Sequence, residues 1–294
     1  MRTYPEVSAV GARAVCLGVI AALMAWPAAA QTPAPAEPQQ PSPAPDRCLA
    51  LARNEAPSGP LFQRARFELA SLKPYQIRLT YHGHSTFTLE SPKGVAVTTD
   101  YNDYVRPPVT PVIATMNVAH STHYTDSPDP GIRHVLRGWN PDGDAPAIHD
   151  LTVEDLRVRN VPTNIRSSYG GPTSGRFGNS IFVFEVAGFC VAHLGHLHHA
   201  LTTQQLAQIG QMDIVLVPVD GSYTLDLAGM LEVLKNMKAR TIIPMHWFSG
   251  FSLGVFMEAA KDHFEVVENP SPTITFSRDQ MPEKPRLIVM PPGG

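Results

Sequence analysis

Histidine side chains are concentrated in one short stretch of this sequence, VAHLGHLHHAL at residues 191–201. The stretch holds four of the twelve histidines in the chain: His193, His196, His198 and His199. A neutral imidazole is a frequent metal ligand and general base, and histidine is also common on solvated helix ends. The cluster therefore suggests metal or acid–base chemistry, which the positions of the other histidines must support.

Other histidines follow predicted strands at separate places in the chain. They are His84 after the first predicted strand, His120 and His123 after the apolar run at 109–116, and His246 at the end of the run at 241–246. Loops that leave strand ends at one edge of a sheet converge into a cleft. Of these, His120, His123 and His246 could form a metal site together with His196, one that keeps an open position. Hydrogen-bonded histidines that line a cleft without metal are the alternative, and the spacing leaves both open.

The elements that would position these side chains begin as β-strands. In the segment 75–100, the apolar side chains of Ile77, Leu79 and Tyr81 alternate with polar ones, and a turn signal follows, so three strands are predicted there. Further strand pairs are predicted over residues 149–162 and 179–195.

After His199 the pattern changes to alternating helices and strands. Thr202 and Gln205 form a capping-box pattern, and Gly210 ends the short helix predicted over 203–209. Ser252 is the predicted N-cap of a later helix. The remaining predicted elements are helices at 225–239 and 252–263 and strands at 213–219, 241–247, 264–268, 273–278 and 286–290.

This order of elements predicts an α/β sandwich of mixed sheets rather than a doubly wound dinucleotide-binding sheet. No GxGxxG or GxxxxGK[ST] sequence lies at a strand–helix junction, so a nucleotide site has no support. The formal net charge of −3 likewise gives no basis for a nucleic-acid partner.

The first thirty residues have the pattern of a secretory signal peptide. Arg2 and Arg13 supply positive charge, and an apolar run over 14–30 ends in small residues, so cleavage is predicted before Gln31. A membrane anchor is the alternative, but a run of 17 residues that contains Pro27 is short for a bilayer span. The mature protein is therefore expected in the periplasm or outside the cell, with no integral membrane segment.

Residues 31–46 are nearly all Pro, Ala, Gln and Ser, which predicts an extended, disordered linker before a folded domain at 47–294. Removal of the signal peptide leaves Cys48 and Cys190. An oxidising compartment permits a disulfide between them. Because Cys190 lies in an apolar strand pattern, a free buried thiol is expected instead.

Two segments together resemble a known family. TYHGHSTFTLE at 80–90, followed by VAVTTD, is similar to the opening hairpin of metallo-β-lactamase-fold hydrolases, particularly the branch that includes ascorbate-phosphate-lactonase-like proteins. The stretch from VAHLGH at 191–196 to PMHW at 244–247 resembles the second half of that branch in order and spacing. The resemblance implies a four-layer αβ/βα sandwich of two mixed β-sheets, with a metal cleft at one edge.

The metal-binding loop of that family, H-x-H-x-D-H, falls on VAHSTH at residues 118–123. His120 and His123 keep two of its histidines, whereas Val118 replaces the first histidine and Thr122 replaces the aspartate. Ile165 and Arg166 lie where the resemblance places a further histidine. The aspartate that bridges two metals in the family is His196 here, and the late histidine is His246.

These substitutions imply an altered metal site. The metal ligands predicted from the resemblance are His120, His123, His196 and His246, which suit one Zn²⁺ with an open position better than a binuclear centre. His84, His193, Asp220 and Tyr223 are assigned to the cleft or to the surroundings of the metal. His198 and His199 are expected to be solvated or to support the ligands, and no catalytic residue is assigned.

The resemblance implies an exported, metal-dependent hydrolase of a small ester, lactone or amide. His196 favours this interpretation, because it places a new ligand where a carboxylate was lost. The alternative is a relative that has lost catalysis and binds a ligand or partner, which the substitutions at Val118, Thr122 and Ile165 favour. An antibiotic β-lactamase is not favoured, because the zinc ligands for lactam hydrolysis are incomplete.

Overall fold

The computed structural model describes residues 48–49, 71–143, 145–166 and 175–293. The predicted signal peptide at 1–30 and the predicted linker at 31–46 lie outside these described residues. Among the described residues, every helix is too short or too polar to cross a lipid bilayer.

A six-stranded mixed sheet is built mainly from the first part of the described chain. Its strand order is β13-β1-β2-β3-β4-β5. The bounds are β1 Gln76–Gly83, β2 Thr86–Glu90, β3 Ala96–Thr98, β4 Ile113–Met116, β5 His134–Arg137 and β13 Thr273–Ser277. The three strands predicted over 75–100 are confirmed as β1 to β3, which pair antiparallel. β5 was not predicted, and His134 belongs to it.

An eight-stranded mixed sheet contains the remaining strands, in the order β12-β14-β11-β10-β9-β8-β7-β6. The bounds are β6 Asp150–Val153, β7 Leu156–Thr163, β8 Asn179–Val186, β9 Phe189–His193, β10 Ile214–Pro218, β11 Thr241–Met245, β12 Glu265–Glu268 and β14 Arg286–Val289. β9, β10 and β11 pair in parallel. All five residues of β10 and all five of β11 are buried, as expected for strands covered on both faces.

Three α-helices follow in the second half: α1 Thr203–Ile209, α2 Leu227–Met237 and α3 Gly250–Ala260. A short 3₁₀ helix, η2, spans Arg278–Gln280. The capping box of Thr202 and Gln205 is present at α1, and Gly210 is its C-cap, as predicted. The N-cap predicted for α3 is wrong, because Ser249 holds that position and Ser252 lies inside the helix, where its hydroxyl donates to the Ser249 carbonyl.

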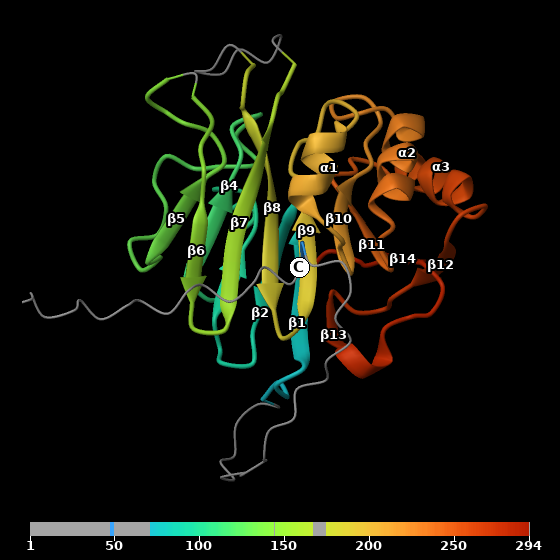
Figure 1. Cartoon of the computed structure of the whole chain (residues 1–294), viewed down its shortest axis with the longest axis horizontal. Coiled ribbons are helices and arrows are strands. Elements are labelled where there is room, and N and C mark those ends of the chain that lie inside the picture. The colour runs from blue at the N-terminus through green and yellow to red at the C-terminus, as the bar shows by residue number, and fades with distance from the viewer. Residues whose placement is uncertain (1–47, 50–70, 144, 167–174, 294) are drawn as a thin grey trace, which may run out of the picture. The chain divides into compact units, whose positions relative to one another are not determined.

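Two apolar layers hold these elements together. One layer lies between the sheets and includes Phe87, Phe182 and Leu216, all at most 1% exposed. The other lies between the eight-stranded sheet and the helices, with Met230 and Phe256 at its centre. Figure 1 shows α1, α2 and α3 grouped on one side of that sheet. The predicted α/β sandwich of two mixed sheets is confirmed.

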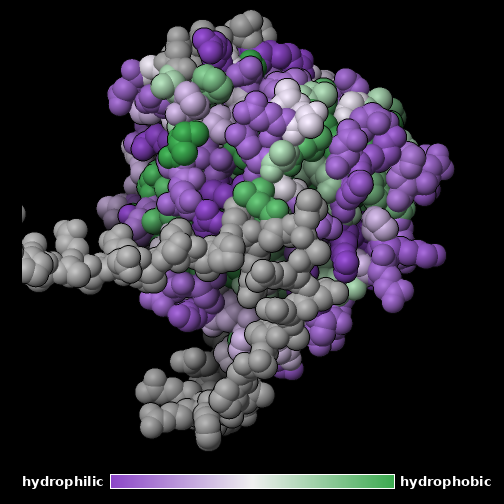
Figure 2. Space-filling model, viewed as in Figure 1, coloured by the Kyte–Doolittle hydropathy of each residue, from purple (hydrophilic) through white to green (hydrophobic). Residues whose placement is uncertain are grey.

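The helical layer lies on one sheet only in the part of the chain that the structure describes. α1, α2 and α3 all come after residue 202, and their buried side chains pack with strands of the eight-stranded sheet. Hydrophilic residues cover most of the face shown in Figure 2, with smaller hydrophobic areas between them.

The expected free thiol at Cys190 is wrong, because Cys190 forms a disulfide with Cys48. The Cα atoms of the pair are 5.9 Å apart. Cys48 reaches β9 because its carbonyl accepts a hydrogen bond from the backbone N–H of Gln211, just after α1. A side chain at Gly210 would collide with that carbonyl, so the glycine also permits this close approach. The position of Cys190 in an apolar strand therefore does not exclude a disulfide bond.

We expect the Cys48–Cys190 bond to stabilise the folded domain, because it closes a loop across 142 positions of sequence. Replacing both cysteines by serine should lower the free energy of unfolding by about 2–4 kcal/mol. Denaturant unfolding of wild type and variant measures the difference, and wild type in reductant should match the variant. Full reactivity of Cys48 and Cys190 with a thiol reagent in unreduced, denatured protein would contradict the bond.

Candidate functional site

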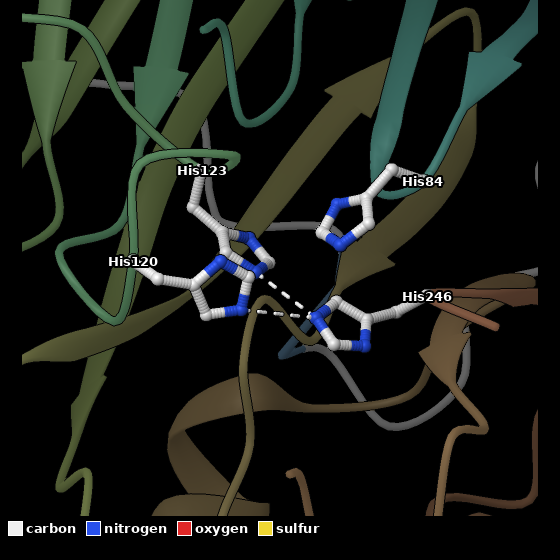
Figure 3. Close-up of side chains that lie close together, drawn as sticks. All are labelled: His84, His120, His123 and His246. Atoms are coloured by element: carbon white, nitrogen blue, oxygen red, sulfur yellow. Dashed lines mark hydrogen bonds between the residues drawn. The ribbon is translucent and has the colours of Figure 1, made fainter. Parts of the chain in front are cut away.

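Four histidines from separate loops converge at one edge of the sheets. His84 lies between β1 and β2, His120 and His123 follow β4, and His246 follows β11. One ring nitrogen from each side chain lies within 4.8 Å of the others. Figure 3 shows the four rings facing a common centre from loops of both sheets. The strand-end positions predicted from the sequence are therefore brought together by the fold.

The closest approach within this histidine centre is between Nε2 atoms. Nε2 of His246 lies 3.1 Å from Nε2 of His123 and 3.4 Å from Nε2 of His120, as the dashed lines in Figure 3 mark. Two nitrogen ligands on a tetrahedral zinc ion, each at about 2.0–2.1 Å, are about 3.3 Å apart. The observed separations fit such an ion.

Each of these three imidazoles is held from behind through Nδ1. Nδ1 of His246 lies 3.1 Å from Oδ1 of Asp220. Nδ1 of His123 lies 2.5 Å from Oδ2 of Asp100. For His120 the partner is the hydroxyl of Thr122, at 2.7 Å. Partners of this kind fix the ring orientation and the tautomer of metal-binding histidines.

The contact with Asp220 fixes the orientation of the His246 ring. Burial acts to raise the pKa of Asp220, but hydrogen bonds from His246 and Thr224 outweigh it and hold the pKa below its ordinary value. Asp220 is therefore ionised, and the Nδ1–H of His246 donates to it. Nε2 of His246 faces the Nε2 atoms of both His120 and His123, and a single imidazole nitrogen can make only one hydrogen bond. A cation at the centre would bind the lone pairs of all three rings.

The protonation states of the cluster also suit a metal. Burial lowers the pKa of His84 to about 3 and the pKa of His120 to about 4, and the nearby His246 adds to both effects. Burial likewise lowers the pKa of His123 well below its ordinary value. These imidazoles are neutral at physiological pH, and the neutral form is the one that binds a metal.

His196 lies directly against the histidine centre. The centre of its ring is 4.8 Å from that of His120, 4.9 Å from that of His123 and 4.7 Å from that of His246. The group of four converging nitrogen atoms nevertheless contains His84 rather than His196. The structure thus groups three of the predicted ligands, His120, His123 and His246, with His84, which the sequence assigned to the surrounding cleft, and places His196 beside this group.

The remaining histidines of the 191–201 stretch have supporting contacts. His193 is fully buried, and its Nε2 donates to the carbonyl of Ser85 at 2.8 Å. His198 is also buried and contacts His196 through Nε2, while its Nδ1 accepts from the backbone N–H of Arg166. His199 accepts a hydrogen bond from the backbone of Asn164.

Two further residues of the site were missed by the sequence analysis. Asp100 is fully buried, and burial raises its pKa although His193 and Asn117 act in the opposite direction. Ser85 places its hydroxyl 3.1 Å from Nδ1 of His123 and 3.0 Å from Nδ1 of His84. The signal for Asp100 was present, because it follows β3 just as the site histidines follow their strands.

Three residues of the site have an unusual backbone conformation. His84, Asp100 and His246 have φ angles of 50°, 42° and 55°, in the left-handed region that non-glycine residues rarely adopt. The backbone N–H of His246 donates to the carbonyl of His84 at 2.7 Å, which joins the two sheets at the centre. Such strain persists where the surroundings hold it, often at functional sites.

Two positions where the resemblance placed further histidines are filled by apolar packing instead. Val118 is 4% exposed and Ile165 is 6% exposed, and both belong to an apolar cluster with Met116 and Trp139. Thr122 lies beside the histidine centre, with its hydroxyl 3.3 Å from Nε2 of His84. Val118 and Ile165 therefore belong to the protein core and supply no metal ligand.

The comparison with known families agrees with this geometry. The beta-lactamase superfamily domain matches residues 78–246, which is more than half of the chain. A UPF0173 metal-dependent hydrolase of Thermoplasma acidophilum is 26% identical over 196 residues, which cover 58% of this chain and 83% of the relative. A UPF0173 metal-dependent hydrolase of Carboxydothermus hydrogenoformans is 33% identical over 91 residues, covering 31% of this chain and 40% of the relative.

Solved structures show the same fold. A protein of Thermotoga maritima assigned to the Zn-dependent hydrolases of the metallo-β-lactamase superfamily has a TM-score of 0.53 and 28% identity, covering 73% of this chain and 98% of its own. A protein of Parabacteroides distasonis assigned as a metal-dependent hydrolase has a TM-score of 0.50 and 14% identity, covering 63% of this chain and 89% of its own. The latter likeness concerns the fold alone.

We expect His246→Ala to abolish tight zinc binding, because it removes the nitrogen that contacts both His120 and His123. Asp220→Asn should weaken zinc affinity by about 10–100-fold, because it removes the charge that orients His246. Competition with a chromophoric zinc chelator measures both. His263→Ala is the matched control, because His263 is exposed and precedes β12, at the opposite end of the parallel strands from His246, which follows β11. Unchanged affinity in His246→Ala would contradict the site.

Proposed function

The chain belongs to the beta-lactamase superfamily domain family, and on this basis we propose that it is a metal-dependent hydrolase that holds one zinc ion in the histidine centre. Its substrate is a small ester, lactone or amide. The observation that carries the proposal is the contact of Nε2 of His246 with Nε2 of both His120 and His123.

A zinc ion is the metal that this set of side chains suits best. Imidazole nitrogens suit zinc, copper, iron and nickel, whereas magnesium and calcium prefer oxygen. A single ion is proposed, because Val118 and Ile165 are packed in the core and supply no ligand to a second one. When bound, such an ion lowers the pKa of a water molecule to about 7 and polarises a carbonyl group.

The chain's own residues set how well this chemistry can proceed. Asp220 and Asp100 hold His246 and His123 in fixed orientations, which keeps the ligand geometry ready. Thr122 occupies the position of the family's aspartate and cannot accept a proton near neutral pH. A general base contributes about 10²–10⁴-fold to a rate, so the proposed hydrolase is slow or has an altered mechanism.

The proposed location is the periplasm or the cell exterior. The signal-like sequence at 1–30 is one support. The Cys48–Cys190 disulfide is a second and independent one, because disulfides persist in oxidising compartments and are rare in the cytosol.

A second candidate function is ligand binding without catalysis. The observation that favours it is the apolar packing of Val118 and Ile165 together with the threonine at 122. The two candidates differ in one measurable respect: a hydrolase turns over simple esters or lactones, loses this activity to a chelator and regains it with zinc. A binding protein shows no turnover in either state.

Thr122→Asp should raise the rate of ester or lactone hydrolysis by about tenfold or more, because it restores a carboxylate beside His84 and His120. Steady-state kinetics on phenyl acetate and γ-butyrolactone, at equal zinc content, measures the change. Thr122→Asn has a similar shape without the charge, and we expect no gain from it. Equal rates for Thr122→Asp and wild type would show that catalysis does not use this position.

A further inference from the structure

Two exposed aromatic rings stand at the mouth of the histidine centre. The side chain of Phe248 is 60% exposed and that of Tyr223 is 51% exposed. The centre of the Phe248 ring lies 5.2 Å from that of His246 and 5.7 Å from that of His84. The Tyr223 ring meets the Phe248 ring nearly at a right angle, 72°, with 5.5 Å between their centres. We call this pair the aromatic corner.

The backbone fixes the aromatic corner in place. Tyr223 follows β10, and its backbone N–H donates to Oδ2 of Asp220, the same carboxylate that holds His246. The carbonyl of Tyr223 accepts a hydrogen bond from the guanidinium of Arg166 at 3.1 Å. Phe248 follows His246 by two residues. Asp220 therefore holds both Tyr223 and His246, so the fold sets the distance between the aromatic corner and His246.

The chemistry of the corner favours a flat, aromatic group. Aromatic rings attract other rings in edge-to-face arrangements at centre separations of about 4.5–7 Å. Arg166, whose guanidinium lies at this loop, bonds with the carbonyls of Ser222, Tyr223 and Thr224. The two exposed rings therefore offer contacts to a further aromatic ring.

We propose that Phe248 and Tyr223 determine substrate specificity by binding an aromatic ring of the substrate beside its ester, lactone or amide carbonyl. This inference rests on the proposed hydrolase function. The ring of the substrate completes the corner and buries apolar surface that is otherwise exposed to water at the mouth of the site. Binding there leaves the carbonyl next to His246 and His84, where the proposed metal lies.

The test compares an aryl ester with an alkyl ester. Phe248→Ala should raise the KM for phenyl acetate by about tenfold while kcat stays unchanged, because the ring contact contributes to binding rather than to bond breaking. The KM for ethyl acetate should not change, and zinc content should equal that of wild type. Phe248→Trp keeps an aromatic ring and should retain the wild-type preference.

Phe251→Ala is the matched control, because Phe251 is 81% exposed on α3 and should leave both KM values unchanged. Equal changes for the two esters in Phe248→Ala, or no change for either, would overturn the specificity role. If wild type hydrolyses neither ester, the kinetic comparison cannot be made, and NMR titration with benzamide then tests the corner independently of the proposed function. Binding weakened about tenfold in Phe248→Ala would support it, and equal binding would overturn it.

Discussion

The site depends on one arrangement, in which three imidazoles present Nε2 to a common point while Nδ1 of each is held from behind. Asp220, Asp100 and Thr122 provide these contacts to His246, His123 and His120. Three imidazole nitrogens that face one another at this short range suit a cation between them, because each can donate a lone pair to it. The left-handed backbone at His84, Asp100 and His246 is part of the same arrangement, because it turns these residues toward the centre.

The positions compared with the family's metal motif fall into two groups. His120, His123 and His246 converge in the histidine centre, whereas Val118 and Ile165 pack with Trp139 in the core. Apolar side chains at these two positions leave no unpaired polar groups in the core. The proposal of a single metal ion follows from this division.

Much of the fold could be predicted from local patterns. The bounds of α1 followed from its capping box, and buried strands such as β10 followed from continuous apolar runs. The pairing of Cys48 could not be predicted, because it depends on how the chain near residue 48 meets the end of α1. The N-cap of α3 was ambiguous, since Ser249 and Ser252 offer the same side chain one turn apart.

For the candidate site, the histidines could be placed at strand ends, but not their distances. Whether His84 or His196 approaches the other ring nitrogens depends on the turn between β1 and β2, where the left-handed backbone of His84 directs the side chain. Asp100 follows β3, but this position identifies it as a site residue only when the sheet edge that carries the site is already known. The aromatic corner of Phe248 and Tyr223 joins two loops that no local pattern connects.

The central claim is that the histidine centre holds one metal ion. Elemental analysis of metal per chain tests it most directly, on protein purified without a histidine tag, incubated with excess zinc and freed of unbound ions. The account predicts about one zinc ion per chain, in agreement with a site built from one converging group of nitrogens. Protein that retains no metal after this treatment would contradict the account.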